Sequence, residues 1–257
     1  MTRALGAFHW DWLLQLAMAL FAWGVVAPAW AEPSYCDPAL FDEKRISIGA
    51  FEETEKAQLY RINAFQLGKV TLVGAAVGDS KTQSLVDLAL RFAPHSKEKR
   101  YCTWYLNHPR EGKEGQPSDG KPLSPKDLNR KEASQTFIHR DILKNPIEMS
   151  EDEAGQEFIK VLGPSFDQDP ASFLSCAEDQ HYIALGCNGM MHRGPTAFGM
   201  LLAFSGCTPS HALEITNQIW GLNGVRRKVR MKAIARAFEL GSQRKASQKR
   251  LAELFSP

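Results

Sequence analysis

The sequence has 257 residues, of which 44% are hydrophobic, and a formal net charge of +2. This length suits one large domain or two small ones, with ample apolar material for a core. The nearly neutral charge gives no electrostatic reason to expect nucleic acid as a partner, so the function must come from a local site.

The first 31 residues have the pattern of a cleavable secretory signal. Arg3 lies near the start, residues 13–26 are mostly apolar, and residues 29–31, Ala-Trp-Ala, offer small side chains for cleavage. The apolar stretch is shorter than the roughly 20 residues that span a bilayer, which disfavours an uncleaved anchor. We therefore expect a mature domain of residues 32–257, periplasmic or secreted, without stable insertion into a membrane.

The first elements of the mature chain alternate between strand and helix patterns. Residues 69–78 are rich in Val and Leu and bounded by Gly, which predicts a strand. Residues 79–93 repeat apolar side chains at helical spacing from Leu85 to Phe92, which predicts an amphipathic helix. Aromatic and β-branched residues then favour a strand over residues 100–107.

A long polar segment separates these elements from the next ones. Residues 108–135 are rich in Pro, Gly and charged side chains and have no apolar period, so we expect a loop insertion there. Residues 136–143 have the pattern of a strand. Residues 150–163 predict a helix with Ser150 at its cap, a Glu three residues later and a glycine at its end.

The last strand and helix predicted in this region flank a short loop. Residues 181–185, HYIAL, are an apolar run typical of a buried strand, and residues 196–206 have a helical pattern that ends at a glycine. The order of strands and helices along the chain favours an α/β fold. We expect a central, mostly parallel sheet flanked by helices.

All five cysteines follow the expected cleavage point. Disulfides persist in an exported protein, and an odd number leaves at least one thiol outside intramolecular pairs. No two are spaced C-x-x-C, so neither a thioredoxin-type redox pair nor a zinc knuckle is expected. The cysteines are Cys36, Cys102, Cys176, Cys187 and Cys207.

The loop at residues 186–195, GCNGMMHRGP, combines Cys187 with Arg193 six positions later. In a strand-to-helix turn the first helical amides point into the loop and can bind an anion, aided by the helix dipole. The planar guanidinium of Arg193 can grip two oxygens of that anion. The same field favours the reactive thiolate of Cys187. Together these groups suit phosphoryl transfer through a phosphocysteine.

This stretch resembles the cysteine-dependent protein tyrosine and dual-specificity phosphatases, whose C-x5-R signature lies between a buried strand and a helix. The resemblance covers mainly residues 181–220, and Gly206, Thr208 and Pro209 also stand where that family often has glycine and a Ser/Thr-Pro start. It implies a phosphatase-like α/β fold, Cys187 as the nucleophile, and a phosphate held by Arg193 and the loop. The phosphate-binding residues would be Asn188, Gly189, Met190, Met191, His192, Gly194 and Thr196.

The signature is degenerate at three positions. Gly186 replaces the histidine that normally precedes the nucleophile, and Gly194 replaces the Ser or Thr that helps the thiolate leave. Met190 stands where the family usually has glycine. Thr196 offers a hydroxyl from a shifted position.

Such phosphatases also need an acid to protonate the leaving oxygen. In the family this acid is an aspartate upstream of the nucleophile, before a helix that leads into the strand. Asp141, ahead of the helix that starts near Ser150, is the preferred candidate. Its spacing to Cys187 is longer than usual, so Asp167 and Asp169 are its rivals.

Two classes of function are open at this point. The first is a periplasmic or secreted cysteine-dependent phosphatase that hydrolyses phosphomonoesters of a protein or a small molecule. This hypothesis implies no metal or organic cofactor. The second is a noncatalytic, disulfide-stabilised envelope protein, with Cys187 tied to Cys176 or Cys207. A pseudophosphatase that only binds phosphate lies between them. A disulfide at Cys187 would remove the nucleophile, so the pairing of the cysteines discriminates between the classes.

Overall fold

A computed structural model describes residues 31–47, 63–76, 103–107, 137–141, 149–167, 172–187, 193–221 and 224–257. The chain divides into two units, Met1–Ala31 and Glu32–Pro257, and all helices and strands given below belong to the second unit. The expected helix at 79–93 and loop insertion at 108–135 lie outside the described residues. So does the expected signal, apart from Ala31, and its cleavage stays a prediction.

The strands are β1 (Arg45–Ile46), β2 (Asn63–Leu67), β3 (Val70–Ala76), β4 (Thr103–Asn107), β5 (Phe137–Asp141) and β6 (Tyr182–Cys187). The helices are α2 (Pro38–Phe41), α5 (Glu151–Leu162), α6 (Phe173–Gln180), α7 (Arg193–Phe204), α8 (Pro209–Trp220), α9 (Gly224–Gln243) and α10 (Lys245–Phe255). Three short 3-10 helices join them: η1 (Ser34–Cys36), η2 (Asp42–Lys44) and η6 (Gly163–Phe166).

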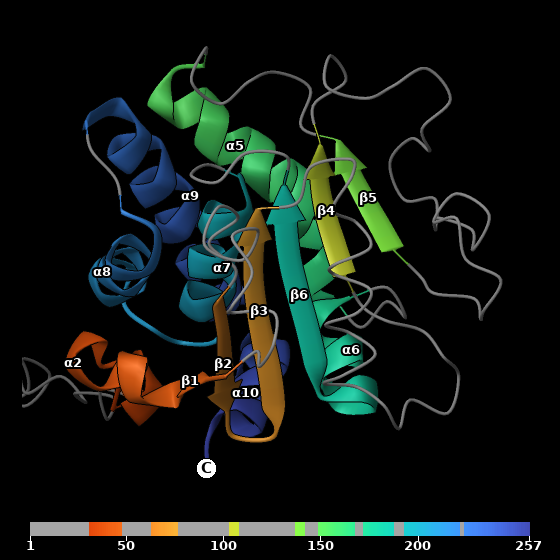
Figure 1. The fold of residues 1–257 in the computed structure, drawn as a ribbon. Coiled ribbons are helices and arrows are strands. Elements are labelled where there is room, and N and C mark those ends of the chain that lie inside the picture. The colour runs from red at the N-terminus through yellow and green to blue at the C-terminus, as the bar shows by residue number, and fades with distance from the viewer. Residues whose placement is uncertain are drawn as a thin grey trace, which may run out of the picture. The chain divides into compact units, whose positions relative to one another are not determined.

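The strands form one mixed sheet in the order β1-β2-β3-β6-β4-β5 (Figure 1). The neighbours β3, β6, β4 and β5 pair in parallel, whereas β1, β2 and β3 pair antiparallel. The turn at Gly68 and Lys69 explains the antiparallel part, because a two-residue connection can only return the chain alongside itself. Gly68 has φ +51° and its Cα lies against the carbonyl oxygen of Ser256, so this turn requires glycine. The expected α/β architecture is confirmed, but the sheet is mixed.

Strand β6 occupies the middle of the parallel part, between β3 and β4. All six of its residues are buried, as expected for a strand covered on both faces. Ile183, Leu185 and Cys187 alternate along the face that joins the hydrophobic core with the helices. The apolar run at residues 181–185 therefore predicted the strand, which extends two residues further to Cys187.

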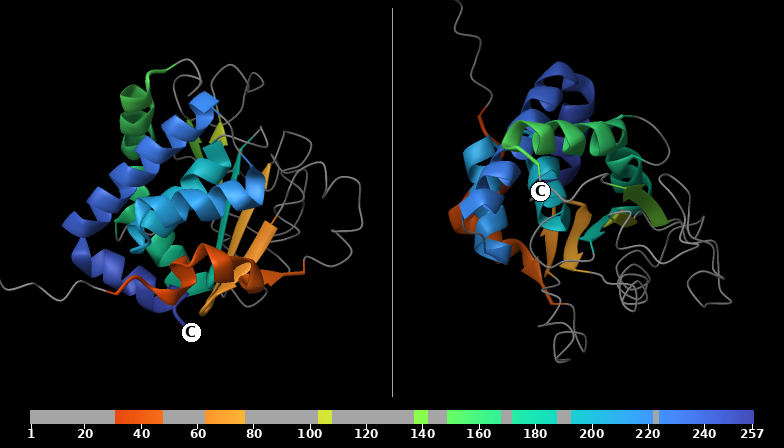
Figure 2. Two further views of the ribbon diagram at one scale, coloured as in Figure 1. Left: turned by 90° about the vertical axis from the view of Figure 1, so that its left-hand side faces the viewer. Right: turned by 90° about the horizontal axis from the view of Figure 1, so that it is seen from above.

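Helices α5 to α10 lie on one side of the sheet (Figure 2). Helix α5 begins with the expected capping box: the Glu153 N–H donates to Ser150 Oγ (3.3 Å) and the Ser150 N–H donates to Glu153 Oε2 (2.9 Å). Helix α7 packs against strands β6 and β3. It begins at Arg193, whereas the sequence pattern predicts a start at residue 196. Pro195 fits this first turn because the first four amides of a helix have no partner inside it.

Close contacts fix the relative direction of α7 and α9. A Cβ added at Gly199 of α7 would lie 2.6 Å from Ile234 Cδ1 of α9 and 2.8 Å from Thr216 Oγ1 of α8. Further along, Phe204 of α7 lies against Gly241 of α9. Because the residue numbers rise together on both helices, α7 and α9 run in the same direction. Both begin on the side of the sheet where β6 ends.

Helix α5 runs in that same direction, and acidic side chains near its start meet α9. Gly155 lies against Lys232 near the start of the pair, and Gly163 lies against Leu240 near its end. Ion pairs join Lys228 to Glu151 (3.4 Å) and Lys232 to Asp152 (3.1 Å), so part of the basic surface of α9 is neutralised by α5. Among the described residues, no helix has both the length and the apolar character needed to cross a bilayer.

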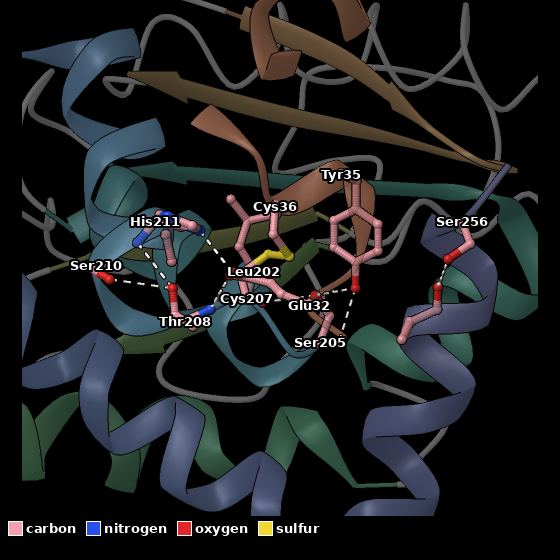
Figure 3. The surroundings of a disulfide bond; sticks show 12 residues. Glu32, Tyr35, Cys36, Leu202, Ser205, Cys207, Thr208, Ser210, His211 and Ser256 are labelled. Atoms are coloured by element: carbon pink, nitrogen blue, oxygen red, sulfur yellow. Dashed lines mark hydrogen bonds and ion pairs between the residues drawn. A yellow bond between two sulfur atoms is a disulfide. The ribbon is translucent and has the colours of Figure 1, made fainter. Parts of the chain in front are cut away.

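The N-terminal residues 32–36 are tied to the connection between α7 and α8 (Figure 3). Cys36 forms a disulfide with Cys207 across a sequence separation of 171 residues. The Tyr35 hydroxyl donates to the carbonyl oxygen of Ser205 (2.9 Å), and burial raises the pKa of this phenol well above its ordinary value. Glu32, the first residue of the second unit, accepts the Thr208 N–H (2.6 Å), and its other oxygen lies 2.8 Å from His211 Nδ1.

Candidate active site

The candidate site lies where the parallel strands reach their carboxyl ends. Cys187 is the last residue of β6, and its Cα partners are Ala76 of β3 and Leu106 of β4. In open α/β sheets, ligands bind outside the carboxyl ends of the strands, where loops leave the sheet and helix N-termini face it. Cys187 therefore lies at the edge of the sheet where proteins of this architecture usually bind ligands.

Cys187 is fully buried and keeps its thiol. Cys207 is bonded to Cys36, and Cys176 is disulfide-bonded as well. The pairing of Cys187 with either of them is therefore wrong for this structure. The tertiary fold therefore leaves Cys187 outside any disulfide, although all five cysteines lie in the segment expected to be exported.

Arg193 is the first residue of α7 and only 5% of it is exposed. Gly194 and Thr196 follow in the same buried turn, so the hydroxyl-bearing residue is offset by two positions from the glycine. The amides of this turn have no acceptor inside the helix and carry the positive end of its dipole. The loop from Cys187 to Arg193 thus connects a buried thiol to a buried cation at a helix N-terminus.

The five residues between Cys187 and Arg193 lie outside the described residues. They are Asn188, Gly189, Met190, Met191 and His192. Their part in phosphate binding stays a prediction.

Asp141 ends β5, at the same edge of the sheet as Cys187. Its Cα pairs with Asn107, and the preceding Arg140 pairs with Leu106, which in turn pairs with Cys187. Two strand spacings therefore separate the backbones of β5 and β6, about 10 Å at the usual interstrand distance. The structure does not describe the Asp141 side chain, and its role as an acid stays a prediction.

Asp167 lies at the opposite end of the helical layer. It follows α5 and η6, and α5 runs in the same direction as α7 and α9, away from the carboxyl edge. A helix of this length spans about 18 Å. The carboxylate of Asp167 forms an ion pair with Arg244 (2.5 Å). This position argues against Asp167 as the acid, and Asp169 lies outside the described residues.

Arg230 of α9 is a buried cation that the sequence analysis did not identify. Only 1% of it is exposed, and its Nη1 donates to Asn217 Oδ1 (2.9 Å). Burial lowers the pKa of Arg230 to about 9, and a smaller electrostatic contribution from Cys187 acts in the opposite direction. A sequence signal existed, because Arg230 has helical spacing with the buried Ala233, Ile234 and Ala237.

The described part of the chain offers no set of side chains placed to ligate a metal. No cluster of three or more His, Cys, Asp or Glu side chains is arranged there to hold a metal ion.

Comparisons with known proteins give a distant likeness to solved structures. Neither a protein-family model nor a curated protein matches the sequence. One similar solved structure is the core catalytic domain of the PP-IP phosphatase SIW14 from S. cerevisiae in complex with citrate. The similarity covers 72% of this chain and 93% of that one, with 10% identity and a TM-score of 0.39. A likeness at this level does not establish a shared fold or a shared activity.

Proposed function

We propose that the protein is a cysteine-dependent phosphatase that hydrolyses phosphomonoesters through a phosphocysteine intermediate. The observation that carries this proposal is the position of an intact thiol, Cys187, at the carboxyl end of the central parallel strand. Six residues later, the buried Arg193 opens α7. A nucleophile, a cation and a helix N-terminus thus come together within one strand-loop-helix unit.

The reaction would proceed in two displacements. In the first, the Cys187 thiolate attacks phosphorus, the Sγ–P bond forms, and the P–O bond to the leaving group breaks as that oxygen takes a proton from an acid. In the second, water attacks the phosphorus and gives its proton to the same residue, now a base. The S–P bond breaks, and inorganic phosphate and the thiolate are released. We assign the acid and base role to Asp141.

The start of α7 would stabilise the charge on the transferring phosphoryl group. Arg193 presents a planar pair of donors to two phosphoryl oxygens, and backbone N–H groups at the start of α7, which have no acceptor within the helix, supply further donors. Gly194 brings no hydroxyl to assist departure of the thiolate. We assign that supporting part to Thr196, whose side chain lies in the same buried turn.

The substrate class follows from the chemistry and the expected location. The proposed reaction suits a phosphorylated protein or a small phosphoester, and a secretory signal at residues 1–31 would place it in the periplasm or outside the cell. The experiment is hydrolysis of an aryl phosphate by the mature chain and by Cys187→Ser. We expect turnover by the first protein only, with similar thermal unfolding of both. Hydrolysis of the aryl phosphate by Cys187→Ser at the native rate would contradict the proposal.

One observation favours a second candidate, a pseudophosphatase that binds phosphate without turning it over. The residue after Arg193 is a buried glycine, so the hydroxyl usual at that position is absent from the first turn of α7. Calorimetric titration with inorganic phosphate separates the two candidates. Binding that Arg193→Met abolishes, without any hydrolysis of aryl phosphate, would favour the pseudophosphatase.

A further inference from the structure

We infer that residues 32–46 form an N-terminal strap, which closes over an aromatic surface and is then locked in place by oxidation. The strap contains η1, α2, η2 and β1 and lies along the β2 edge of the sheet (Figure 1). In the reduced chain it opens as a unit while the sheet stays folded, and the disulfide between Cys36 and Cys207 holds it closed. No strap residue belongs to the candidate site, so the strap is independent of the proposed function.

The strap covers aromatic side chains from three separate elements. Phe41 of α2 packs on Phe65 of β2, with ring centroids 4.9 Å apart, and on Phe198 of α7, at 6.2 Å. Tyr35 of η1 meets Phe255 of α10 edge to face at 5.7 Å. Phe41 and Tyr35 are each only 1% exposed. Opening of the strap therefore exposes apolar surface of the sheet and of two helices, which favours the closed form in water.

Polar contacts hold the two ends of the strap. At the start, Glu32 accepts the Thr208 N–H, and the Tyr35 hydroxyl donates to the carbonyl oxygen of Ser205. At the other end, β1 contributes only two residues to the edge of the sheet, fewer than a typical strand. Strand β2 pairs with β3 on its other side, so it keeps a partner when β1 leaves. The strap can therefore detach as a local unit.

The disulfide shifts this local equilibrium toward the closed form. Cys36 lies in η1, so its bond to Cys207 and the pairing of β1 close a short loop that contains α2 and η2. Closing a loop of about 10 to 15 residues makes the closed form roughly a hundredfold more favourable, because the open form loses conformational freedom. The bond forms by thiol–disulfide exchange, in which the two thiols pass two electrons and two protons to a disulfide oxidant that leaves as two thiols.

The closed strap also shields the bond that holds it. Cys36 and Cys207 are both fully buried, at 0% exposure. Reduction requires an external thiolate to reach one of the two sulfurs, so it must wait until the strap opens. In a reducing compartment the strap stays in equilibrium with its open form. In the oxidising compartment expected for the mature chain it is fixed, and it resists reductants afterwards.

Hydrogen exchange tests whether the strap opens on its own. Amide exchange is measured by mass spectrometry at several low urea concentrations, in the native protein and in the double variant Cys36→Ser, Cys207→Ser. We expect peptides from the strap to exchange roughly a hundredfold faster in the double variant, at rates that low urea does not change. Peptides from β6 should exchange at rates that rise with urea, because their amides open only when the sheet unfolds. Equal rates and equal urea dependence for the strap and β6 would overturn the inference.

Reduction of the native disulfide tests the shielding without removing a cysteine. The protein is treated with dithiothreitol, and the thiols released are labelled with iodoacetamide and assigned to Cys36 and Cys207 by mass spectrometry. Phe41→Ala removes the ring that seats the strap and leaves both sulfurs in place, so we expect its reduction to be at least about tenfold faster than in the native protein. Leu40→Ala is the matched control, because Leu40 is in the same helix and is 43% exposed. It should be reduced at the native rate.

The outcomes of this second measurement also decide the matter. Equal reduction rates in Phe41→Ala and Leu40→Ala would overturn the role of the strap, because it would then not control access to the sulfurs. So would a reduction rate of Phe41→Ala that rises with urea as steeply as exchange in β6, since the bond would then be reached only through unfolding of the whole domain. Faster reduction of Phe41→Ala that is independent of low urea supports the strap, and this measurement remains decisive if the double variant does not fold.

Discussion

The two ends of α7 carry cysteines with opposite chemistry. Beyond its C-terminus, Cys207 is cross-linked to Cys36, and the hydroxyl of Tyr35 is bonded to Ser205 (Figure 3). Before its N-terminus, Cys187 keeps a thiol. The compartment expected for the chain is the same for both, so the redox environment does not decide which sulfur pairs. Geometry does, because a disulfide forms only where two Cα atoms come within about 7 Å with suitable directions.

The interactions at the C-terminal end of α7 influence the geometry of its N-terminal end. The C-terminal end is held by a covalent bond, a buried hydroxyl and the carboxylate of Glu32. That anchor fixes the axis of α7 and, through Gly199, its contacts with α8 and α9. The N-terminal end can then present Arg193 and the first-turn amides in a set direction. Changes at the two ends should therefore affect different properties of the protein.

The largest effect is expected at the N-terminal end. Arg193→Lys should lower aryl phosphate hydrolysis roughly 10⁴-fold, because an ammonium cannot replace the planar pair of donors on the transferring phosphoryl group. Initial rates should be compared with those of Arg227→Lys, an exposed change that we expect to be neutral. A rate within tenfold of the native one would show that Arg193 does not bind the reacting phosphate.

The disulfide end should respond in stability rather than in chemistry. Replacing Cys36 and Cys207 together by Ser should lower the free energy of unfolding by about 4 kcal/mol, since the cross-link closes a very long loop in the unfolded chain. Chemical denaturation gives that value. Well below its unfolding transition, the variant should still alkylate Cys187 at the native rate. Slower alkylation in the folded variant would mean that the two ends of α7 are coupled.

A buried phenol on β6 should give a smaller effect that depends on pH. Tyr182 is fully buried, its hydroxyl has no hydrogen-bond partner among the described residues, and burial raises its pKa above the ordinary value of 10. The phenol therefore stays protonated in the folded state when it ionises in the unfolded chain. The folded state is favoured below pH 10 and loses this stability as the pH rises further.

Tyr182→Phe tests this directly. It should stabilise the protein by about 1 kcal/mol at pH 7, because it removes an unsatisfied buried hydroxyl. It should also lessen the loss of stability above pH 10. Denaturation at pH 7 and at pH 10.5 measures both. A destabilised variant at pH 7 would indicate that the hydroxyl has an acceptor.

The smallest effect is expected at Glu32. Glu32→Gln keeps an acceptor for the Thr208 N–H but removes the charge beside His211, so it should cost about 0.5 kcal/mol, as partly exposed ion pairs do. Thermal unfolding of the mature chain detects a change of this size. Glu43→Gln is the matched control, because Glu43 is exposed in η2. An equal effect in both variants would exclude a specific anchor at Glu32.

Local sequence patterns predicted much of this fold. The apolar run at 181–185 and the Val- and Leu-rich run at 69–78 correspond to β6 and β3. The capping box at Ser150 and Glu153 marked the start of α5 because its two hydrogen bonds join residues three apart. The start of α7 was set three residues too late, because the glycine and proline after Arg193 suggested a loop although both fit a first helical turn.

The candidate site was only partly predictable. Cys187 and Arg193 are near neighbours in sequence, so their spacing was enough to propose an anion-binding turn. Arg230 was not recognisable, because it is one of several basic residues in its segment and only its burial separates it from them. The position of Asp141 and Cys187 at the same edge of the sheet could be inferred only from the order of strands in the sheet. The order of strands along the chain does not reveal it.

The sequence by itself determined strand β6, the capped start of α5 and the short spacing between Cys187 and Arg193, because these depend on residues close in the chain. The tertiary structure decided that Cys36 pairs with Cys207, that Arg230 is buried, and that Asp141 lies at the same edge of the sheet as Cys187. Those outcomes depend on contacts between residues far apart in sequence, which form only when the helices pack on the sheet.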